Sequence, residues 1–199
     1  MNEIHEAMKG FTDVPIAALS LLFALLLRKK NASKDWSALF FLVACAGALG
    51  AVVHGLALSR AASAVVWTVL HPFLYESVRR FGLLFPSFID GKERRSAPAV
   101  FAAEIGFYLA GLPILYLFPP NDIYPFAAFA VLIFIQTVVA IVRAPRLPRL
   151  AVWFLVLLAI PLLLQIGETV IPYAVVIEHL FLALDLYIAY RIALTAKSE

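Results

Sequence analysis

The stretch Ile171–Leu194, IPYAVVIEHLFLALDLYIAYRIAL, decides the fold that we expect for this chain. It is long and apolar enough to cross a bilayer as a helix, yet it carries Glu178, His179 and Asp185. On insertion scales an acid at the centre of a membrane helix costs roughly 2.5 to 3.5 kcal/mol. Such a segment is stable only against a polar interior, which the rest of the chain must supply.

The composition is typical of a membrane protein. Hydrophobic residues make up 63% of the 199 positions, whereas soluble domains contain about 45 to 50%. Because a membrane helix needs about 20 apolar residues, the chain has room for seven short-looped spans and for no separate catalytic domain. Seven apolar runs can be drawn, over Asp13–Leu27, Trp36–Leu58, Ala62–Val78, Ala97–Phe118, Ile123–Val142, Leu150–Leu164 and Thr169–Leu194. The sequence therefore predicts one all-α domain over residues 1–199, a seven-transmembrane helix bundle.

The basic residues predict the orientation of this bundle. Lysines and arginines gather in the first, third and fifth connections and in the C-terminal tail, whereas the other connections hold only Arg60 as a basic residue. Cytoplasmic loops carry such an excess, so we expect the N-terminus outside and the C-terminus inside. The net charge of +3 reflects this topology, and no nucleic-acid partner is expected. We expect a multi-pass protein of the cell membrane that contacts membrane lipids; its oligomeric state stays open.

Local patterns predict how individual helices pack. The second run contains Ala46/Gly50 and Gly47/Ala51 at a spacing of four, which lets helix backbones approach closely and favours a central position. The connection from Arg79 to Arg95 interleaves large apolar residues with arginines. It is compatible with a segment that rests on an anionic leaflet, or with a frayed inner end of the third helix and a turn at Asp90-Gly91.

Polar side chains gather in the outer half of the predicted bundle. Counting from the ends of the spans at about 1.5 Å per residue places Asp13, His54, His71, Glu178 and His179 there, with Asp185 deeper. Glu178 and Asp185 share one face of the last helix because seven residues separate them. Glu76 and Glu104 belong to the inner half. The outer half is therefore where we expect a functional site.

These residue types are suited to a zinc site. Three neutral imidazoles can hold zinc while the fourth position binds a water whose pKa falls towards about 7. His54, His71 and His179 are the histidines inside the predicted spans. Asp13, Glu178 and Asp185 are the acids that could orient them or act as the general base. Histidines that close hydrogen bonds between helices are the alternative. The single cysteine, Cys45, excludes an intrachain disulfide and a thiolate cluster.

A resemblance to a known superfamily points in the same direction. The run Gly47-Ala48-Leu49-Gly50-Ala51-Val52-Val53-His54 resembles the small-residue run that ends in a ligand histidine in the alkaline ceramidases and adipoQ-receptor-like proteins. The resemblance implies a zinc-dependent hydrolase of lipid amide or ester bonds, with His54 and His179 as ligands and a lipid as substrate. Two features depart from it: Gly50 replaces a serine, and Ala183 occupies the position of a second histidine in the last helix.

Other functions are also compatible with the sequence. Intramembrane acids could form a proton or cation pathway, with Glu76 and Glu104 leading to the inner face. His71 and His179 could ligate haem, and a scaffolding role without chemistry is a further alternative. Retinal binding through a Schiff base is not expected, because every lysine lies outside the predicted spans.

Overall fold

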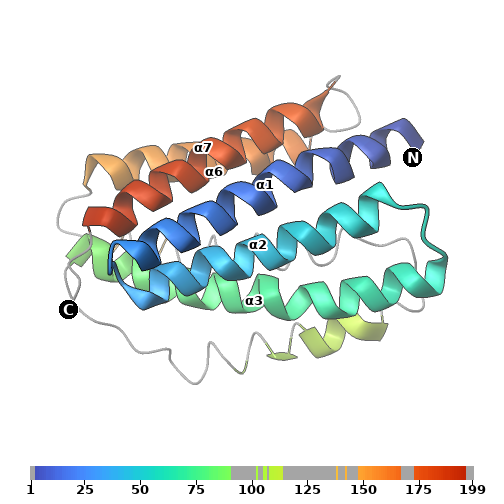
Figure 1. The fold of residues 1–199 in the computed structure, drawn as a ribbon, viewed down its shortest axis with the longest axis horizontal. Helices are drawn as coiled ribbons and strands as arrows, with labels where there is room; N and C mark the ends of the chain where they lie inside the picture. Colours follow the sequence, from blue (N-terminus) through green and yellow to red (C-terminus); the bar gives the residue numbers. More distant parts are fainter. Residues whose placement is uncertain are drawn as a thin grey trace.

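The computed structural model describes residues 3–90, 102, 105, 106, 108–113, 138, 142, 148–166 and 173–195, and every regular element in these ranges is an α-helix. The elements are α1 (Glu3–Lys29), α2 (Lys34–Gly55), α3 (Arg60–Asp90), α6 (Arg149–Ile166) and α7 (Ala174–Thr195). They run roughly along one long axis as a bundle (Figure 1). The expected all-α fold is confirmed, and the five helices coincide with five of the seven predicted runs. The predicted runs Ala97–Phe118 and Ile123–Val142 lie mostly outside the described residues.

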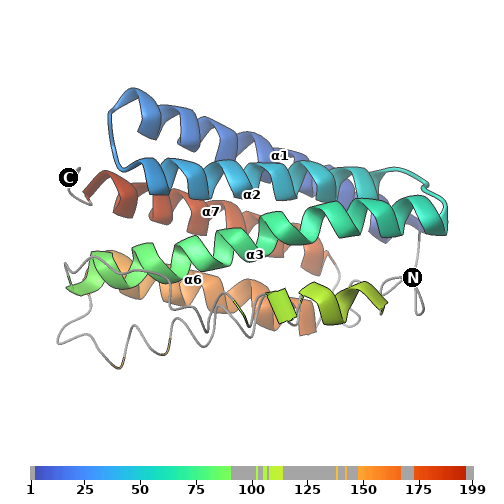
Figure 2. The ribbon, with the colours of Figure 1, turned by 90° about the horizontal axis from the view of Figure 1, so that it is seen from below.

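The turn between α1 and α2 has an identifiable cap. Asn31 adopts a φ of 51°, a left-handed conformation that asparagine tolerates better than most residues. The Ala32 amide bonds the Leu27 carbonyl at 3.0 Å, and the Asn31 amide bonds the Arg28 carbonyl at 3.2 Å. This is the Schellman arrangement, which satisfies carbonyls at a helix end and reverses the chain. It places α1 and α2 antiparallel and side by side (Figure 2).

Small residues let α1 and α2 come very close. A Cβ on Gly10 would lie 2.3 Å from the Gly55 backbone nitrogen, and one on Gly47 would lie 3.2 Å from the Ala17 nitrogen. The Ser37 hydroxyl also donates across the helix pair to the Ala24 carbonyl at 2.9 Å. The close packing predicted for the small residues of the second run is therefore confirmed.

Helix α3 is longer than the predicted run Ala62–Val78. It continues through Pro72 to Asp90, and Phe81 and Phe85 are buried. The connection up to Asp90 is therefore a regular part of α3, neither a separate segment on a leaflet surface nor a frayed helix end; the helix does end at Asp90, where the alternative placed a turn. Phe81 and Phe85 pack into the core.

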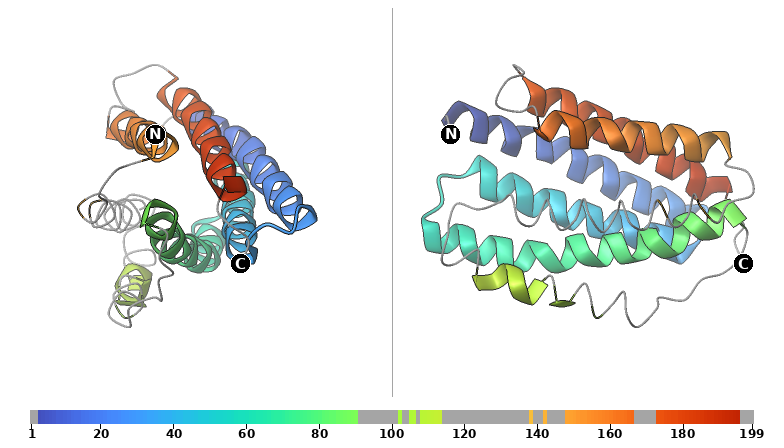
Figure 3. Two further views of the ribbon diagram at one scale, coloured as in Figure 1. Left: turned by 90° about the vertical axis from the view of Figure 1, so that its left-hand side faces the viewer. Right: turned by 180° about the vertical axis from the view of Figure 1, so that it is seen from behind.

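The remaining helices complete an arc of neighbours. Helix α7 contacts α1 on one side and α6 on the other, while α2 contacts α1 and α3. The end-on view in Figure 3 shows the order α3, α2, α1, α7, α6 around an interior. Near the end that carries the α1–α2 turn, the Phe154 ring contacts Phe81 at 5.3 Å between centroids. This contact joins α6 to α3 across the arc.

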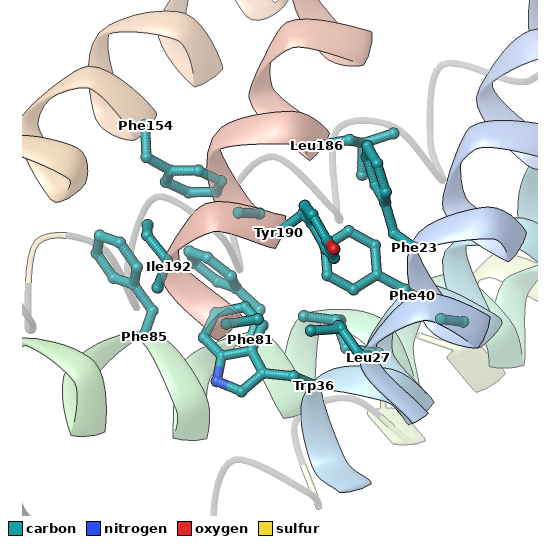
Figure 4. Close-up of a cluster of buried hydrophobic side chains, with 14 of the residues drawn as sticks. Phe23, Leu27, Trp36, Phe40, Phe81, Phe85, Phe154, Leu186, Tyr190 and Ile192 are labelled. Atoms are coloured by element: carbon teal, nitrogen blue, oxygen red, sulfur yellow. The ribbon is translucent and has the colours of Figure 1, made fainter. Parts of the chain in front are cut away.

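An aromatic cluster fills the interior at that end. Phe81 stacks on Phe85 at 5.0 Å, and Phe23 stacks on Tyr190 at 4.5 Å. Figure 4 shows these rings beside Trp36, with side chains from all five helices. We call this end of the bundle the basic end, because the α1–α2 turn places Arg28, Lys29 and Lys30 there. The opposite end, which carries His54 and His179, is the histidine end.

Two of the described helices are long and apolar enough to cross a membrane. They are Met8–Lys29 and Lys34–Gly55, judged by length and composition. Helix α6 contains a shorter apolar stretch, Arg149–Pro161. The finding is compatible with a membrane location and concerns the described residues alone.

Candidate functional site

The strongest polar contact at the histidine end joins α1 to α7. His179 Nε2 lies 3.1 Å from Asp13 Oδ1, and His179 Nδ1 lies 2.8 Å from the Val175 carbonyl oxygen. Both side chains are largely buried, with 15% and 17% of their surfaces exposed. These residues are 166 positions apart in sequence. The bundle thus brings together two residues that the sequence predicted to share a site.

The hydrogen-bond geometry sets the number of protons on this pair. A carbonyl oxygen can only accept, so His179 Nδ1 carries a hydrogen. The bond to Asp13 then needs one further proton, held either by Nε2 or by the carboxyl group. In both arrangements the pair is neutral overall, which lowers the cost of burying it. Loss of that proton would leave a buried negative charge.

Gly50 creates the space that Asp13 occupies. A Cβ at Gly50 would lie 2.8 Å from Asp13 Oδ2 and 3.2 Å from Asp13 Cγ. The carboxyl group therefore lies against the backbone of α2 while it reaches His179 on α7. Gly50 stands where the ceramidase pattern has a serine. Because glycine has no side chain, the Asp13 carboxyl group occupies the space beside α2 at this position.

The two other histidines of the predicted site are arranged differently. His54 on α2 contacts the Trp67 ring edge-on at 5.7 Å between centroids, and Trp67 contacts His71 at 5.8 Å. The indole therefore contacts both imidazoles.

His71 lies in an aromatic surrounding. Its ring centroid is 5.8 Å from Tyr75 and 6.4 Å from Tyr108. The side chain is fully buried, and among the described residues neither ring nitrogen has a hydrogen-bond partner. The Tyr108 hydroxyl donates to the Thr68 carbonyl at 3.5 Å. Glu104, which the sequence places one turn from Tyr108, lies outside the described residues.

Two more polar groups are buried in the interior. Asp185 on α7 is 3% exposed and Ser20 on α1 is fully buried. Neither Asp185 Oδ1 nor Ser20 Oγ has a hydrogen-bond partner among the described residues. Unpaired buried polar atoms are costly, so each requires a physical explanation. Glu178 is partly buried on the same side of α7 as Asp185.

A spacing of seven residues divides the interior into layers. Residues seven apart lie about 10 Å apart along a helix and about 20° apart around it. The base layer, at the basic end, consists of Leu27, Trp36, Phe81, Phe154 and Ile192. The middle layer consists of Ser20, Val43, Leu74, Pro161 and Asp185. The upper layer, at the histidine end, consists of Asp13, Gly50, Trp67 and Glu178.

The polar groups avoid the base layer entirely. The upper layer holds the Asp13–His179 pair, His71 lies one turn from Trp67 towards the middle layer, and the middle layer holds Ser20 and Asp185. The base layer is apolar and buried. The interior is therefore polar from the histidine end to its centre and closed by aromatic side chains beyond.

The described residues do not form the predicted zinc site. Among them, no group of three histidine, cysteine, aspartate or glutamate side chains could hold a metal ion. Trp67 contacts both His54 and His71, and His179 pairs with Asp13. Zinc and its ligand set of three histidines stay predictions.

Comparisons with known proteins place the chain in a family. A profile described as "family of unknown function (DUF6962)" matches residues 8–196. The chain belongs to this family. No curated protein and no solved structure matches it. The resemblance of this DUF6962 protein to alkaline ceramidases and adipoQ-receptor-like proteins therefore stays a prediction.

Sequence reasoning missed several features of this DUF6962 protein. Ser20 is a small polar residue in an apolar run, and only its register on α1 shows that it faces the interior. Trp67 was not recognised as a contact of both His54 and His71. Glu76 binds Arg79 at 2.5 Å and Arg80 at 2.9 Å, and Arg80 also binds Asp35 at 2.9 Å. Among the described residues, Glu76 therefore ties the basic ends of α2 and α3 through Arg80.

Proposed function

We propose that this protein is a seven-span integral membrane protein that carries protons or a coupled cation through its interior. The observation that supports this proposal is the Asp13–His179 pair: two ionisable side chains from different helices share one proton inside an apolar bundle. Intramembrane ionisable pairs of this kind mark ion and proton pathways. The proposal adopts the pathway that the sequence left as the alternative to hydrolysis.

The outward-facing side chains support a membrane setting for more than two helices. Large apolar residues are exposed on α3, α6 and α7 as well as on α1. They include Val65, Val69, Trp153, Val156, Leu180 and Leu184. An apolar exterior around a polar interior is the reverse of a soluble protein and suits contact with lipid. Together with the apolar runs outside the described residues, this favours seven spans in the cell membrane.

The charges at the ends of the helices support the orientation. The basic end carries Arg28, Lys29 and Lys30, and Arg79 and Arg80 lie on the same side. Positive residues stay on the cytoplasmic side. The histidine end then faces outwards, and the N-terminus of α1 lies outside. The polar half of the interior opens to the outside, and the aromatic base layer closes it towards the cytoplasm.

The proposed pathway follows the layers inward. The Asp13–His179 pair accepts a proton from the outer side and forms the upper station. Asp185 in the middle layer is the next ionisable group towards the cytoplasm among the described residues of α1 and α7. The base layer must open for an ion to pass, because its side chains offer no acceptor and only the indole N–H of Trp36 as a donor.

Proton flux into liposomes tests this function. Purified protein is reconstituted with a pH-sensitive dye inside, and an acid jump is applied outside. We expect Asp13→Asn and His179→Gln to abolish the flux of the wild type. Asp35→Asn is the matched control, because Asp35 is an exposed aspartate at the basic end. Wild-type flux no faster than that of empty liposomes would overturn the proposal.

Zinc-dependent lipid hydrolysis is the second candidate function, and one distance favours it. Nitrogen and oxygen ligands of a tetrahedral zinc ion lie about 3.3 to 3.4 Å apart, and His179 Nε2 and Asp13 Oδ1 are 3.1 Å apart. The two atoms could therefore bind one ion, provided that residues outside the described ranges complete the site. Stoichiometric zinc in the purified wild type that is lost in both Asp13→Asn and His179→Gln would support hydrolysis; metal-free wild type would exclude it.

A further inference from the structure

The middle layer contains oxygen atoms that no described residue satisfies. Asp185 Oδ1 and Ser20 Oγ are both buried without a hydrogen-bond partner among the described residues. The cost of burying an isolated carboxylate is far larger than that of a hydroxyl group. A buried carboxyl group without a partner therefore either takes up a proton or is balanced by a bound cation.

The two oxygens lie at the same height in the bundle. Helices α1 and α7 run in the same direction, since Asp13 contacts His179 near one end and Phe23 stacks on Tyr190 near the other. The sequence offset between the helices is nearly the same in both contacts. It places Ser20 near the turn of α7 that carries Asp185, within about 1.5 to 3 Å along the axis.

Ser20 belongs to the stripe of α1 that faces the interior. It is seven residues from Asp13, which touches both α2 and α7. Ser20 therefore points about 20° away from that direction, two turns deeper. Asp185 is in turn seven residues from Ile192, which lies in the aromatic cluster (Figure 4). Both side chains are thus directed to the interior.

A proline on the neighbouring helix supplies another oxygen near this height. Pro161 is buried inside α6, and it has no N–H to bond the Leu157 carbonyl one turn earlier. Phe154 on α6 and Ile192 on α7 lie in the same core cluster, and the two helices are in contact. Pro161 is seven residues from Phe154 and Asp185 is seven residues from Ile192, so Pro161 and Asp185 lie near the same height. Carbonyls freed in this way coordinate sodium ions or protons in membrane transporters.

We propose that Asp185, Ser20 and the Leu157 carbonyl form a binding site for a small monovalent cation, with sodium as the probe. The three groups are hard oxygen donors with a single negative charge among them. Calcium takes six to eight oxygens, and transition metals prefer nitrogen or sulfur ligands, whereas the one acid of this site balances one positive charge. The inference rests on the proposed pathway, in which this site holds the transported or coupling ion.

The test is the thermal stability of the purified protein in sodium chloride and in choline chloride at equal ionic strength. A cation that binds the folded state alone stabilises it by RT ln(1 + c/Kd), where c is the cation concentration, so the melting temperature rises with the cation concentration. We expect sodium, but not choline, to stabilise the wild type. Asp185→Asn should weaken the apparent sodium affinity by about tenfold or more, because it removes a charged ligand.

A pair of serine variants separates ligation from general destabilisation. Ser20→Ala should weaken the apparent sodium affinity several-fold. Ser77→Ala is the matched control, since Ser77 is also a buried serine, but its hydroxyl already donates to the Leu74 carbonyl at 2.7 Å. Its sodium response should equal that of the wild type. Equal losses in the two variants would contradict a role for Ser20 as ligand.

The outcomes also distinguish this site from the proposed function. Asp13→Asn and His179→Gln should lose proton flux but keep the sodium response, because their atoms lie in the upper layer. A wild type that responds equally to sodium and choline overturns the cation site and leaves the proton pathway standing. A sodium response without any proton flux overturns the proton pathway alone. An Asp185→Asn variant that keeps the full response overturns the cation site.

Discussion

At the scale of single residues, the site depends on Gly50, which has no side chain. Asp13 can pair with His179 because Gly50 offers no Cβ, and the carboxyl oxygen lies 2.8 Å from where that atom would be. The sequence predicted both members of the pair, but it predicted for Gly50 only close helix packing and a departure from a family pattern. Close approach of a polar group to a helix backbone requires a residue without a side chain.

Gly50→Ala should therefore break the pair. The added Cβ displaces Asp13 from His179, and overpacking of this kind costs about 1 to 3 kcal/mol. We expect a lower melting temperature and a loss of proton flux in liposomes. Gly106→Ala is the matched control, since no atom lies within 4 Å of its Cβ position. Normal flux in Gly50→Ala would show that the pair is not needed.

At the scale of elements, the α1–α2 pair is the most closely packed part of the described bundle. Glycines make this possible, but they do so unequally. A Cβ on Gly10 would meet the Gly55 backbone at 2.3 Å, whereas a Cβ on Gly55 would meet the Gly10 Cα at an ordinary 3.6 Å. Backbone atoms cannot move aside as a flexible side chain can.

The two glycines should differ sharply on substitution. We expect Gly10→Ala to lower the stability by more than about 1 kcal/mol, because α1 and α2 must separate. Gly55→Ala should change the stability by less than about 0.5 kcal/mol. Chemical or thermal unfolding of the purified variants in one detergent measures both. Equal effects of the two substitutions would mean that the helices are further apart than described here.

The turn between the same helices gives a second prediction at this scale. Asn31 has a positive φ and begins the reversal. Asn31→Gly should keep the stability or raise it, because glycine adopts this conformation without strain. Asn31→Val should lower it by about 1 to 2 kcal/mol, since a left-handed conformation is strained for a residue with a branched Cβ. Melting temperatures of the two variants test the expected difference in sign.

At the scale of the whole molecule, the bundle is divided along its axis. The basic end is apolar inside and charged at its rim, where Arg80 joins Asp35 to Glu76. The histidine end is polar inside, with the Asp13–His179 pair. An interior that is closed on one side and polar on the other is suited to take up an ion from the polar side, and this asymmetry supports the proposed direction of the pathway.

The proposed orientation predicts a pattern of chemical labelling. In a Cys45→Ala background, Ser59→Cys lies between α2 and α3 at the histidine end and should react with a membrane-impermeant thiol reagent in intact cells. Asn31→Cys lies at the basic end and should react only after the cells are opened. Labelling in the reverse order would invert the topology, and labelling of both sites in intact cells would exclude a membrane-crossing α2.

The sequence by itself determined the elements. Apolar runs predicted the five helices that the structure describes. The length and apolar content of a run can be read from its own residues, without knowing which segments it packs against. Depth counting brought Asp13 and His179 together correctly. It also placed His54 and His71 with them. A common ligand set for these histidines stays a prediction, because depth along a helix says nothing of direction around it.

Only the tertiary structure decided which polar groups meet. Trp67 contacts both His54 and His71, Asp13 lies against Gly50, and Ser20 and Asp185 are both buried without a hydrogen-bond partner for Ser20 Oγ and Asp185 Oδ1 among the described residues. Each of these facts depends on the rotation and register of one helix against another. Those are set by side-chain packing between segments far apart in the chain, where Phe154 meets Phe81 and Phe23 meets Tyr190. A single helix's sequence carries no record of such contacts, since its apolar period fixes a buried face but not the partner.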